Sequence, residues 1–247
     1  MDEMRKNEKI KACIAICIII LLILTTWIII FKYQVEGENN IPFKLSKIMI
    51  VSTAEGVENN LEEGKWNLSV FQNNDIYFSI QKNEANNEDN IIESISIENI
   101  QIIQSPNVGK ILTYMPNSSD GRLFNSDESN ILQKNSLTYK GATKSNSKTL
   151  EIGNQGGTAV IRFSNTELGK YISNEEEVKH DGSLISKVGL NEEQIKFTVT
   201  FDFVINLNNK SYKSPITLDM PCTGNLIQNG TCSQEITDGF VFKRVSK

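Results

Sequence analysis

The sequence predicts an all-β domain built as a two-sheet sandwich and preceded by one apolar helix. Three observations support this prediction: apolar and polar residues alternate over Ile195–Leu207, with Val204 the exception; one long apolar run lies near the N-terminus; and turn residues separate many short segments. Alternation at period two is typical of a strand with one buried face, and many such strands with few helices favour two packed sheets. We expect a Greek-key, immunoglobulin-like or jelly-roll-like arrangement, with two short helices in one connection. A barrel is the alternative.

The N-terminal segment predicts a transmembrane signal anchor. The twenty residues from Ala12 to Phe31 carry no charge, and a helix of this length spans a hydrocarbon core of about 30 Å. Four basic residues precede this run, so the N-terminus should be cytoplasmic and the C-terminus extracytoplasmic. A cleaved signal peptide, the alternative, has a shorter apolar core followed by small residues. We expect a cytoplasmic tail at 1–11, an anchor at 12–32, a juxtamembrane linker at 33–41 and an extracytoplasmic β-sandwich at 42–247.

The charge balance limits the partners of the predicted ectodomain. Removing the five bases and three acids of residues 1–32 from the totals of 25 and 30 leaves a formal net charge of −7. Binding of nucleic acid rests on neutralising phosphates with Lys and Arg, so neither nucleic acid nor an anionic lipid surface is expected as a partner. The Asn-, Ile- and Lys-rich composition suggests a low-GC bacterium as the source.

The cysteines fall into two pairs. Cys222 and Cys232 enclose a turn-rich loop, and outside the membrane two nearby cysteines with no other partner form a disulfide. A metal site is the alternative, but two thiols without a nearby histidine are a poor ligand set. Cys13 and Cys17 share one face of the apolar helix, where they can face lipid or a partner helix.

A hairpin is predicted from Ile195–Leu207 and the following segment, which ends at Met220. Apolar residues occupy odd positions before Asn208-Asn209 and even positions after it, so a two-residue turn brings both sets onto one face. Asn tolerates the positive φ of a type I′ turn. Pro215 cannot donate to a ladder, so we expect the second strand to be an edge strand or to bulge there. The predicted pairs are Phe197 with Met220, Val199 with Leu218, Phe201 with Ile216, and Ile205 with Tyr212.

A second hairpin is predicted between residues 66 and 80. Trp66, Leu68 and Val70 are apolar at even positions, and so are Ile76, Phe78 and Ile80. Equal parity requires an odd loop, and Gln72-Asn73-Asn74 supplies three turn-tolerant residues.

Further elements complete nine or ten expected strands. The range Ile91–Ile103 changes parity near Glu98-Asn99, which predicts a bulge where the strand bends from one sheet toward the other. Helices are expected where Ser164 and Glu167 form a capping box and where Ser183 caps a segment ending at Gly189. The remaining expected strands are 45–51, 148–152, 159–163 and 239–245.

No residue set with catalytic, cofactor-binding or metal-binding spacing stands out. His180 beside Asp181 could act as an oriented base, but an exposed loop histidine at an Asp-Gly turn fits better because no nucleophile motif accompanies it. Asp120, Asp127 and Glu128 could gather around Ca²⁺, although their spacing departs from the usual loop pattern. The glycines at 153, 156 and 157 lack the ending of a phosphate-binding loop and predict a turn between strands.

One partial resemblance concerns the overall layout. A basic leader, an apolar N-terminal helix, a β-rich body and a C-terminal disulfide loop resemble a type IV pilin or pseudopilin. Those proteins carry a small residue before the cleavage point and a glutamate five residues after it, and the segment Lys11–Cys17 has no such glutamate. The resemblance would imply processing and assembly into a filament.

The leading hypothesis is a non-enzymatic, single-pass membrane protein that binds a protein or glycan, or fills a structural role, in the bacterial cell envelope. Function would lie in strand-connecting loops, with residues 83–90 and 117–130 as candidates. The alternative is a wall or glycan hydrolase that uses two carboxylates, since such a pair meets only in space.

Overall fold

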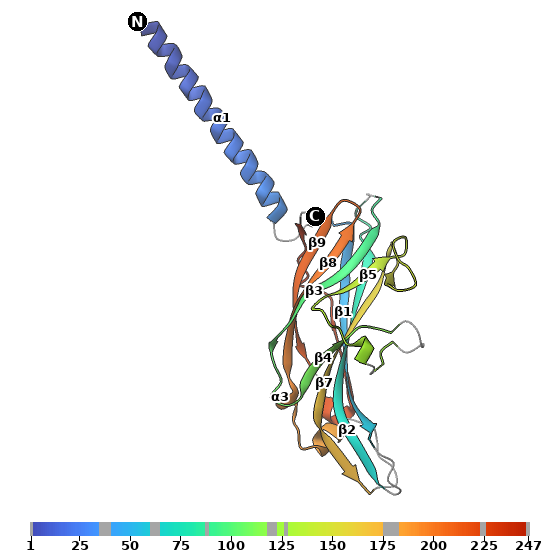
Figure 1. Cartoon of the computed structure of the whole chain (residues 1–247). Helices are drawn as coiled ribbons and strands as arrows, with labels where there is room; N and C mark the ends of the chain where they lie inside the picture. The colour runs from blue at the N-terminus through green and yellow to red at the C-terminus, as the bar shows by residue number, and fades with distance from the viewer. Residues whose placement is uncertain are drawn as a thin grey trace.

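The computed structural model describes residues 2–34, 41–59, 65–86, 89–117, 123–125, 128–174, 183–222 and 226–245. Helix α1 (Asp2–Gln34) extends away from one end of a mostly β domain (Figure 1). On α1 the described side chains are Lys11 and those of residues 13–29. Within the described residues, no helix is both long enough and apolar enough to cross a membrane.

Eleven strands of the described chain form two sheets, in which all neighbours are antiparallel except β5 and β6. Sheet A has the order β10 (Thr231–Ile236), β1 (Phe43–Glu58), β2 (Trp66–Lys82), β7 (Gly156–Ser173), β4 (Lys110–Tyr114). Sheet B has the order β11 (Lys243–Val245), β9 (Ser211–Met220), β8 (Phe197–Leu207), β3 (Ile92–Gln104), β5 (Leu137–Gly141), β6 (Leu150–Ile152). The short helices are α2 (Ser183–Lys187), α3 (Glu192–Ile195), α4 (Leu226–Asn229) and the 3₁₀ turn η1 (Glu128–Asn130).

The main core lies between the two sheets. Phe78 from β2 stacks on Phe203 from β8, with ring centroids 5.0 Å apart, and meets the edge of Phe201 at 5.6 Å. Apolar residues from the inner faces of both sheets surround these rings and are almost completely buried. Aromatic rings contribute large buried areas and a preferred edge or offset geometry. Two sheets sharing one core, with few helices, are consistent with the predicted sandwich.

A tyrosine joins the two sheets at the side of the core. The Tyr139 hydroxyl, carried by sheet B, donates to the carbonyl of Val160 at 2.5 Å and accepts from the Val160 N–H at 2.9 Å. Burial raises the pKa of Tyr139. The pairing of β4 with β7 ends at Arg162, so among the described residues Val160 has no neighbouring strand on that side. The Tyr139 hydroxyl takes the place of that strand as hydrogen-bond partner for the Val160 backbone.

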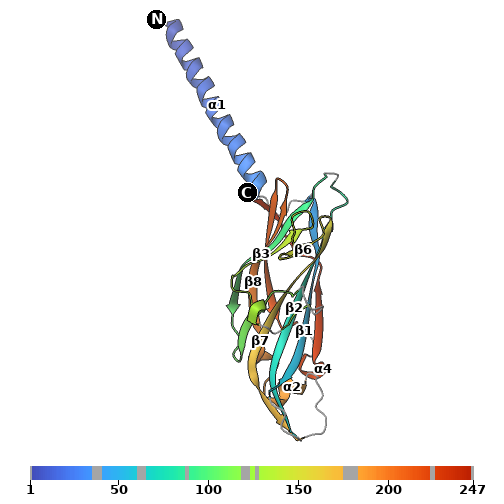
Figure 2. The same ribbon diagram turned by 45° about the vertical axis from the view of Figure 1, so that its right-hand side comes forward.

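A smaller apolar core lies at the end of the β domain opposite α1. There the inner face of sheet A is covered by helices in place of sheet B, and Figure 2 shows α2 and α4 at this end. Leu68 and Val70 from β2 pack with Leu184 and Ile185 from α2 and with Leu226 from α4. All five of these side chains are buried. We call this group the distal core.

The β8–β9 hairpin confirms the first predicted register. All four predicted pairs are present in the ladder. The turn is closed by a hydrogen bond from Leu207 N to Lys210 O at 2.8 Å, but neither Asn208 nor Asn209 has the positive φ expected for a type I′ turn. Pro215 lies beyond the three residues at which β11 pairs with β9, so its missing N–H faces an open edge.

The second predicted hairpin is wrong, because β2 runs through the supposed turn. Residues 66–82 form one 17-residue strand, and Gln72, Asn73 and Asn74 are buried in its middle. The even positions therefore share a face because the strand continues, not because it folds back. The amides of Asn73 and Asn74 find hydrogen-bond partners on both neighbouring strands, and Gln72 donates to Asn74.

The helix predicted at Ser164 and Glu167 is also wrong. Both residues lie within β7, where Thr166, Glu167 and Leu168 oppose a single residue of β2 in a β-bulge. Glu167 adopts φ 62°, a left-handed conformation that turns Leu168 into the distal core. Local sequence signals for a helix start and for such a bulge overlap, since both require a polar residue able to leave extended geometry.

The helix predicted at Ser183 is confirmed as α2. Gly189 ends it with φ 78°, and Leu190 N donates to Ile185 O at 3.2 Å. A second helix in the same connection is α3, which begins with a capping box between Asn191 and Gln194. The described part of the connection between β7 and β8, residues 183–196, therefore holds two short helices, one of them at a different position from that predicted.

Several short strands escaped prediction, namely β4, β5 and β10. The bulge in β3 is confirmed, with Asn99 at φ 54°. The expected change of sheet there is wrong, because β3 pairs with β8 on both sides of the bulge. The glycines near 153 form the predicted turn, which separates β6 from β7.

The predicted disulfide between Cys222 and Cys232 is present, with its Cα atoms 6.4 Å apart. Cys222 is fully buried in the main core, and Cys232 packs against both cores. The bridge therefore ties the loop that carries α4 to the point where the two cores meet.

Removing this bridge should destabilise the domain. We expect the double variant Cys222→Ser, Cys232→Ser to lose about 2–3 kcal/mol of unfolding free energy, because a loop this short gains that much from closure. Urea unfolding measures the loss. Replacing Cys13 and Cys17 by serine is the control and should leave the unfolding midpoint of the β domain unchanged. Equal midpoints for the two double variants would contradict a structural role for the bridge.

Candidate functional site

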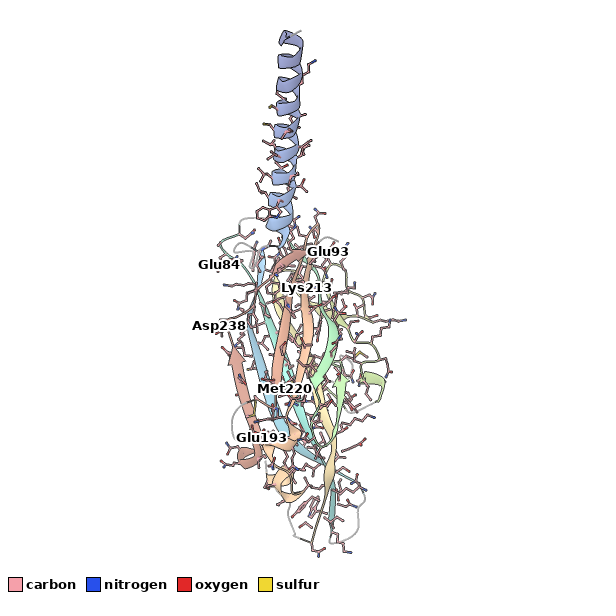
Figure 3. All side chains as sticks on the ribbon, turned by 90° about the vertical axis from the view of Figure 1, so that its left-hand side faces the viewer. Glu84, Glu93, Glu193, Lys213, Met220 and Asp238 are labelled. Atoms are coloured by element: carbon pink, nitrogen blue, oxygen red, sulfur yellow. A yellow bond between two sulfur atoms is a disulfide. The ribbon has the colours of Figure 1, made fainter. Side chains whose placement is uncertain are left out.

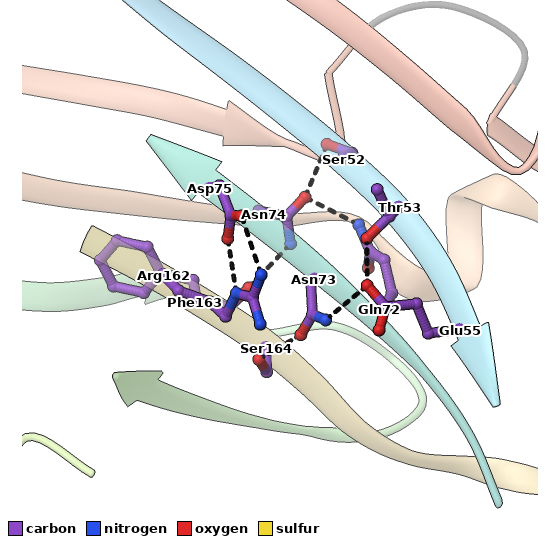
Figure 4. Close-up of polar contacts among 10 residues, drawn as sticks. All are labelled: Ser52, Thr53, Glu55, Gln72, Asn73, Asn74, Asp75, Arg162, Phe163 and Ser164. Carbon is purple, nitrogen blue, oxygen red and sulfur yellow. Dashed lines mark hydrogen bonds and ion pairs between the residues drawn. The ribbon is translucent and has the colours of Figure 1, made fainter. Parts of the chain in front are cut away.

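A row of buried amides crosses the inner face of sheet A between the two cores. We call these amides and the neighbouring serine the polar belt. Its members are Ser52, Gln72, Asn74 and Asn165, and all four are completely buried. The Asn74 Oδ1 atom accepts from Ser52 Oγ at 2.8 Å and from Gln72 Nε2 at 2.9 Å, while its Nδ2 donates to Phe163 O at 3.1 Å (Figure 4). Ser52 Oγ also accepts from the N–H of Cys222 at 3.0 Å, which connects the belt to the disulfide.

Two amide oxygens of the belt have no hydrogen-bond partner among the described residues, Gln72 Oε1 and Asn165 Oδ1. Their residues face each other across β2 and β7 beside the bulge. Asn165 Nδ2 donates to Val108 O at 3.2 Å. Position 109 must be glycine, because a Cβ atom on that residue would overlap the Oδ1 atom of Asn165. Asn165 thus fixes the loop between β3 and β4 to sheet A.

The outer face of the same strands carries an ion pair. Arg162 donates to both oxygens of Asp75, from Nε at 2.5 Å and from Nη2 at 2.8 Å, and its guanidinium lies 4.5 Å from the ring centre of Phe124. Burial lowers the pKa of Arg162, but hydrogen bonding to Asp75 and its charge outweigh this effect and raise it overall. Burial also raises the pKa of the neighbouring Tyr77. The geometry is that of a bidentate structural pair.

Next to this pair, a chain of hydrogen bonds runs across three strands. Ser164 Oγ donates to Asn73 Oδ1 at 2.5 Å, Asn73 Nδ2 donates to Glu55 Oε1 at 2.9 Å, and Thr53 Oγ1 donates to the same carboxylate oxygen at 2.8 Å (Figure 4). Each of the four side chains has a partner within this chain of hydrogen bonds, which therefore stabilises the sheet.

A hollow lies on the outer face of sheet B where α3 meets the sheet. Its volume is about 290 Å³. Gln104, Thr198 and Asp219 form one row across β3, β8 and β9, and Glu192 and Lys196 come from α3 and the residue that follows it. We call it the α3 hollow. Its lining residues are Gln104, Glu192, Lys196, Phe197, Thr198, Asp219, Met220 and Pro221.

The α3 hollow contains both paired and unpaired polar side chains. Thr198 Oγ1 donates to Asp219 Oδ1 at 2.7 Å, and Lys196 Nζ pairs with Glu193 Oε1 at 2.5 Å. Among the described residues, the side chains of Glu192 and Gln104 have no hydrogen-bond partner. The hydrogen bond that Lys196 donates to Glu193 raises the pKa of Lys196, and the charges of Glu193, Glu192 and Asp219 act in the same direction. The electrostatic potential in the α3 hollow is therefore negative.

The candidate base and the candidate calcium ligands of the sequence analysis lie wholly or partly outside the described residues. These are His180, Asp181, Asp120 and Asp127, together with the side chain of Glu128. Parts of the candidate loops 83–90 and 117–130 are outside it too. Across the described residues, no three His, Cys, Asp or Glu side chains gather as a metal site would require.

Sequence reasoning missed both the polar belt and the α3 hollow. The amides of the belt were interpreted as a turn, because an Asn-rich triplet is typical of loops. The members of the hollow lie at positions 104, 192 and 219, so only the pairing of β3, β8 and β9 brings them together. The large apolar side chains exposed on the described β domain come from separate segments; they are Val57, Ile103, Leu123, Ile172 and Val241.

Comparisons with protein-family models, with curated proteins and with solved structures find no match to this chain.

Proposed function

We propose that this protein is a single-pass, membrane-tethered binding or structural module of the bacterial cell envelope, with its β domain outside the cytoplasm. The observation that carries the proposal is the Cys222–Cys232 disulfide within the core of the β domain. Disulfides persist in oxidising compartments and are rare in the cytosol, so a structural bridge favours an extracytoplasmic location. No catalytic role is part of this proposal.

The membrane tether rests on the sequence of the N-terminal segment. The uncharged run from Ala12 to Phe31 has the length of a membrane-spanning helix, and the basic residues before it favour a cytoplasmic N-terminus. The apolar side chains described on α1 are exposed, between 51% and 64% for the large ones, which suits a helix surrounded by lipid. Within the sandwich, we further propose Greek-key connections.

Thiol labelling on intact cells tests the topology. In a background with Cys13 and Cys17 replaced by alanine, Ser147→Cys places a thiol on an exposed loop of the β domain, and Glu8→Cys places one before the apolar run. A membrane-impermeant maleimide should label the first variant in intact cells and the second only after lysis. Labelling of position 8 but not position 147 in intact cells would overturn the proposal, as would recovery of the chain in the soluble fraction.

A glycan hydrolase is the second candidate, and the α3 hollow is the observation that favours it. Glu192 and Asp219 line the same hollow, as a pair of carboxylates does in most glycoside hydrolases. Release of reducing ends from purified cell-wall glycan, lost in a Glu192→Gln, Asp219→Asn variant, would favour the hydrolase. Absence of release by the wild-type chain would favour the binding module.

A further inference from the structure

The α3 hollow has the size and the lining of a site for a small ligand. Residues of β8 and β9, among them Phe197 and Met220, line it together with Glu192 of α3. A volume of about 290 Å³ is close to the lower limit of about 300 Å³ for ligand pockets, which suits a ligand the size of one ring. Figure 3 shows Glu193 and Met220 well away from α1, so the hollow lies at a distance from the proposed membrane surface.

The free groups of the hollow are of two kinds. The Glu192 carboxylate and the second oxygen of Asp219 are acceptors only, whereas the Gln104 amide offers two donors and an acceptor. The carboxylates suit an ammonium group, since charge-assisted hydrogen bonds are the stronger ones. The amide suits a neutral hydroxyl, to which it can donate or from which it can accept.

The charge of the hollow selects the sign of the ligand. Three carboxylates, those of Glu192, Glu193 and Asp219, surround the single ammonium of Lys196, which leaves a formal charge of −2. A concave site of one sign concentrates ligands of the opposite sign. A free amino acid brings a carboxylate that this field repels, whereas an amino sugar carries an ammonium and several hydroxyls without an anion.

We propose that the α3 hollow binds an amino sugar with a free ammonium group, held by Glu192 and Asp219 and oriented through a hydroxyl by Gln104. This inference rests on the proposed function and names the ligand of the binding module, a partly deacetylated glycan of the cell envelope. The aromatic residue among those lining the hollow, Phe197, is 1% exposed and belongs to the main core, so its ring is not available to stack on a sugar. Affinity for a single sugar should therefore lie in the millimolar range.

Ligand titration of the full chain in detergent tests the proposal. Saturation-transfer NMR with glucosamine should give a dissociation constant at least about tenfold lower than with N-acetylglucosamine, which has no ammonium and so forfeits the charge-assisted contacts. The double variant Glu192→Gln, Asp219→Asn should weaken glucosamine binding by about tenfold or more. The matched control is Glu84→Gln, Asp238→Asn, which removes two exposed carboxylates elsewhere and should leave binding unchanged.

A variant that binds glucosamine more tightly shows that the fold is intact, which a variant with weaker binding cannot show. Lys196→Gln removes the one positive charge of the hollow and should tighten glucosamine binding severalfold, which a misfolded variant cannot do. Equal affinity for N-acetylglucosamine, unchanged binding in the double variant, or equally tight binding of putrescine, a diamine without hydroxyls, would each overturn the amino-sugar assignment. Thiol labelling of position 147 is independent of all these outcomes, so the proposed location can stand or fall separately.

Discussion

Replacing Asn74 by alanine should reduce the unfolding free energy by about 3–5 kcal/mol, since a buried group that loses its partner costs about 1–3 kcal/mol. The Asn74 amide serves three partners at once, namely Ser52 Oγ, Gln72 Nε2 and Phe163 O. Alanine at position 74 removes the hydrogen bond that each of these three groups makes to the Asn74 side chain. Asn74 is fully buried, so bulk water cannot easily replace the missing groups.

Urea unfolding followed by circular dichroism measures the effect of Asn74→Ala. The control is Asn107→Ala, an exposed asparagine in the loop between β3 and β4, for which we expect a change within about 0.5 kcal/mol. If both variants unfold at the same urea concentration, the belt does not contribute to stability in the way its hydrogen bonds indicate.

The same residues explain why the second hairpin was mispredicted. Asn73 and Asn74 carry a strong local signal for a turn, and nothing within residues 66–80 contradicts it. The evidence for a continuous strand lies elsewhere, in Ser52 on β1 and in Phe163 and Ser164 on β7. A polar residue inside a strand can be recognised as part of that strand only once its partners on the neighbouring strands are known.

The elements predicted correctly are those whose determinants are close in sequence. The β8–β9 register follows from parity around a two-residue turn, α2 from a cap and a terminating glycine, and the disulfide from two cysteines ten residues apart. Short strands such as β4 and β10 lack a long alternating pattern, because each is only five or six residues long and lies at the edge of sheet A. Their pairing depends on longer neighbours.

The α3 hollow could not be predicted from the sequence for a related reason. Glu192 and Lys196 are separated by one helical turn, so their proximity follows from α3, but Gln104 and Asp219 reach the site through the order of strands in sheet B. Strand order across a sandwich depends on long connections that carry no local register signal.

The second large effect is expected in the main core, where Phe78→Ala should cost about 3–5 kcal/mol of unfolding free energy. Phe78 is completely buried and its ring contacts Phe201 and Phe203 across the space between the sheets. Removing the ring leaves a cavity between two sheets that are each held by their own ladders, so the surrounding structure can collapse only in part.

The same strand supplies a matched control for Phe78. Phe71 lies on the outer face of β2 and is only partly buried, so Phe71→Ala should cost about 1 kcal/mol, the usual size for a substitution that opens no core cavity. Urea unfolding compares the two variants on one strand, with the same side chain removed from opposite faces. A loss for Phe71→Ala equal to that for Phe78→Ala would mean that the outer face of sheet A is covered in solution, which would move the search for a partner from sheet B to sheet A.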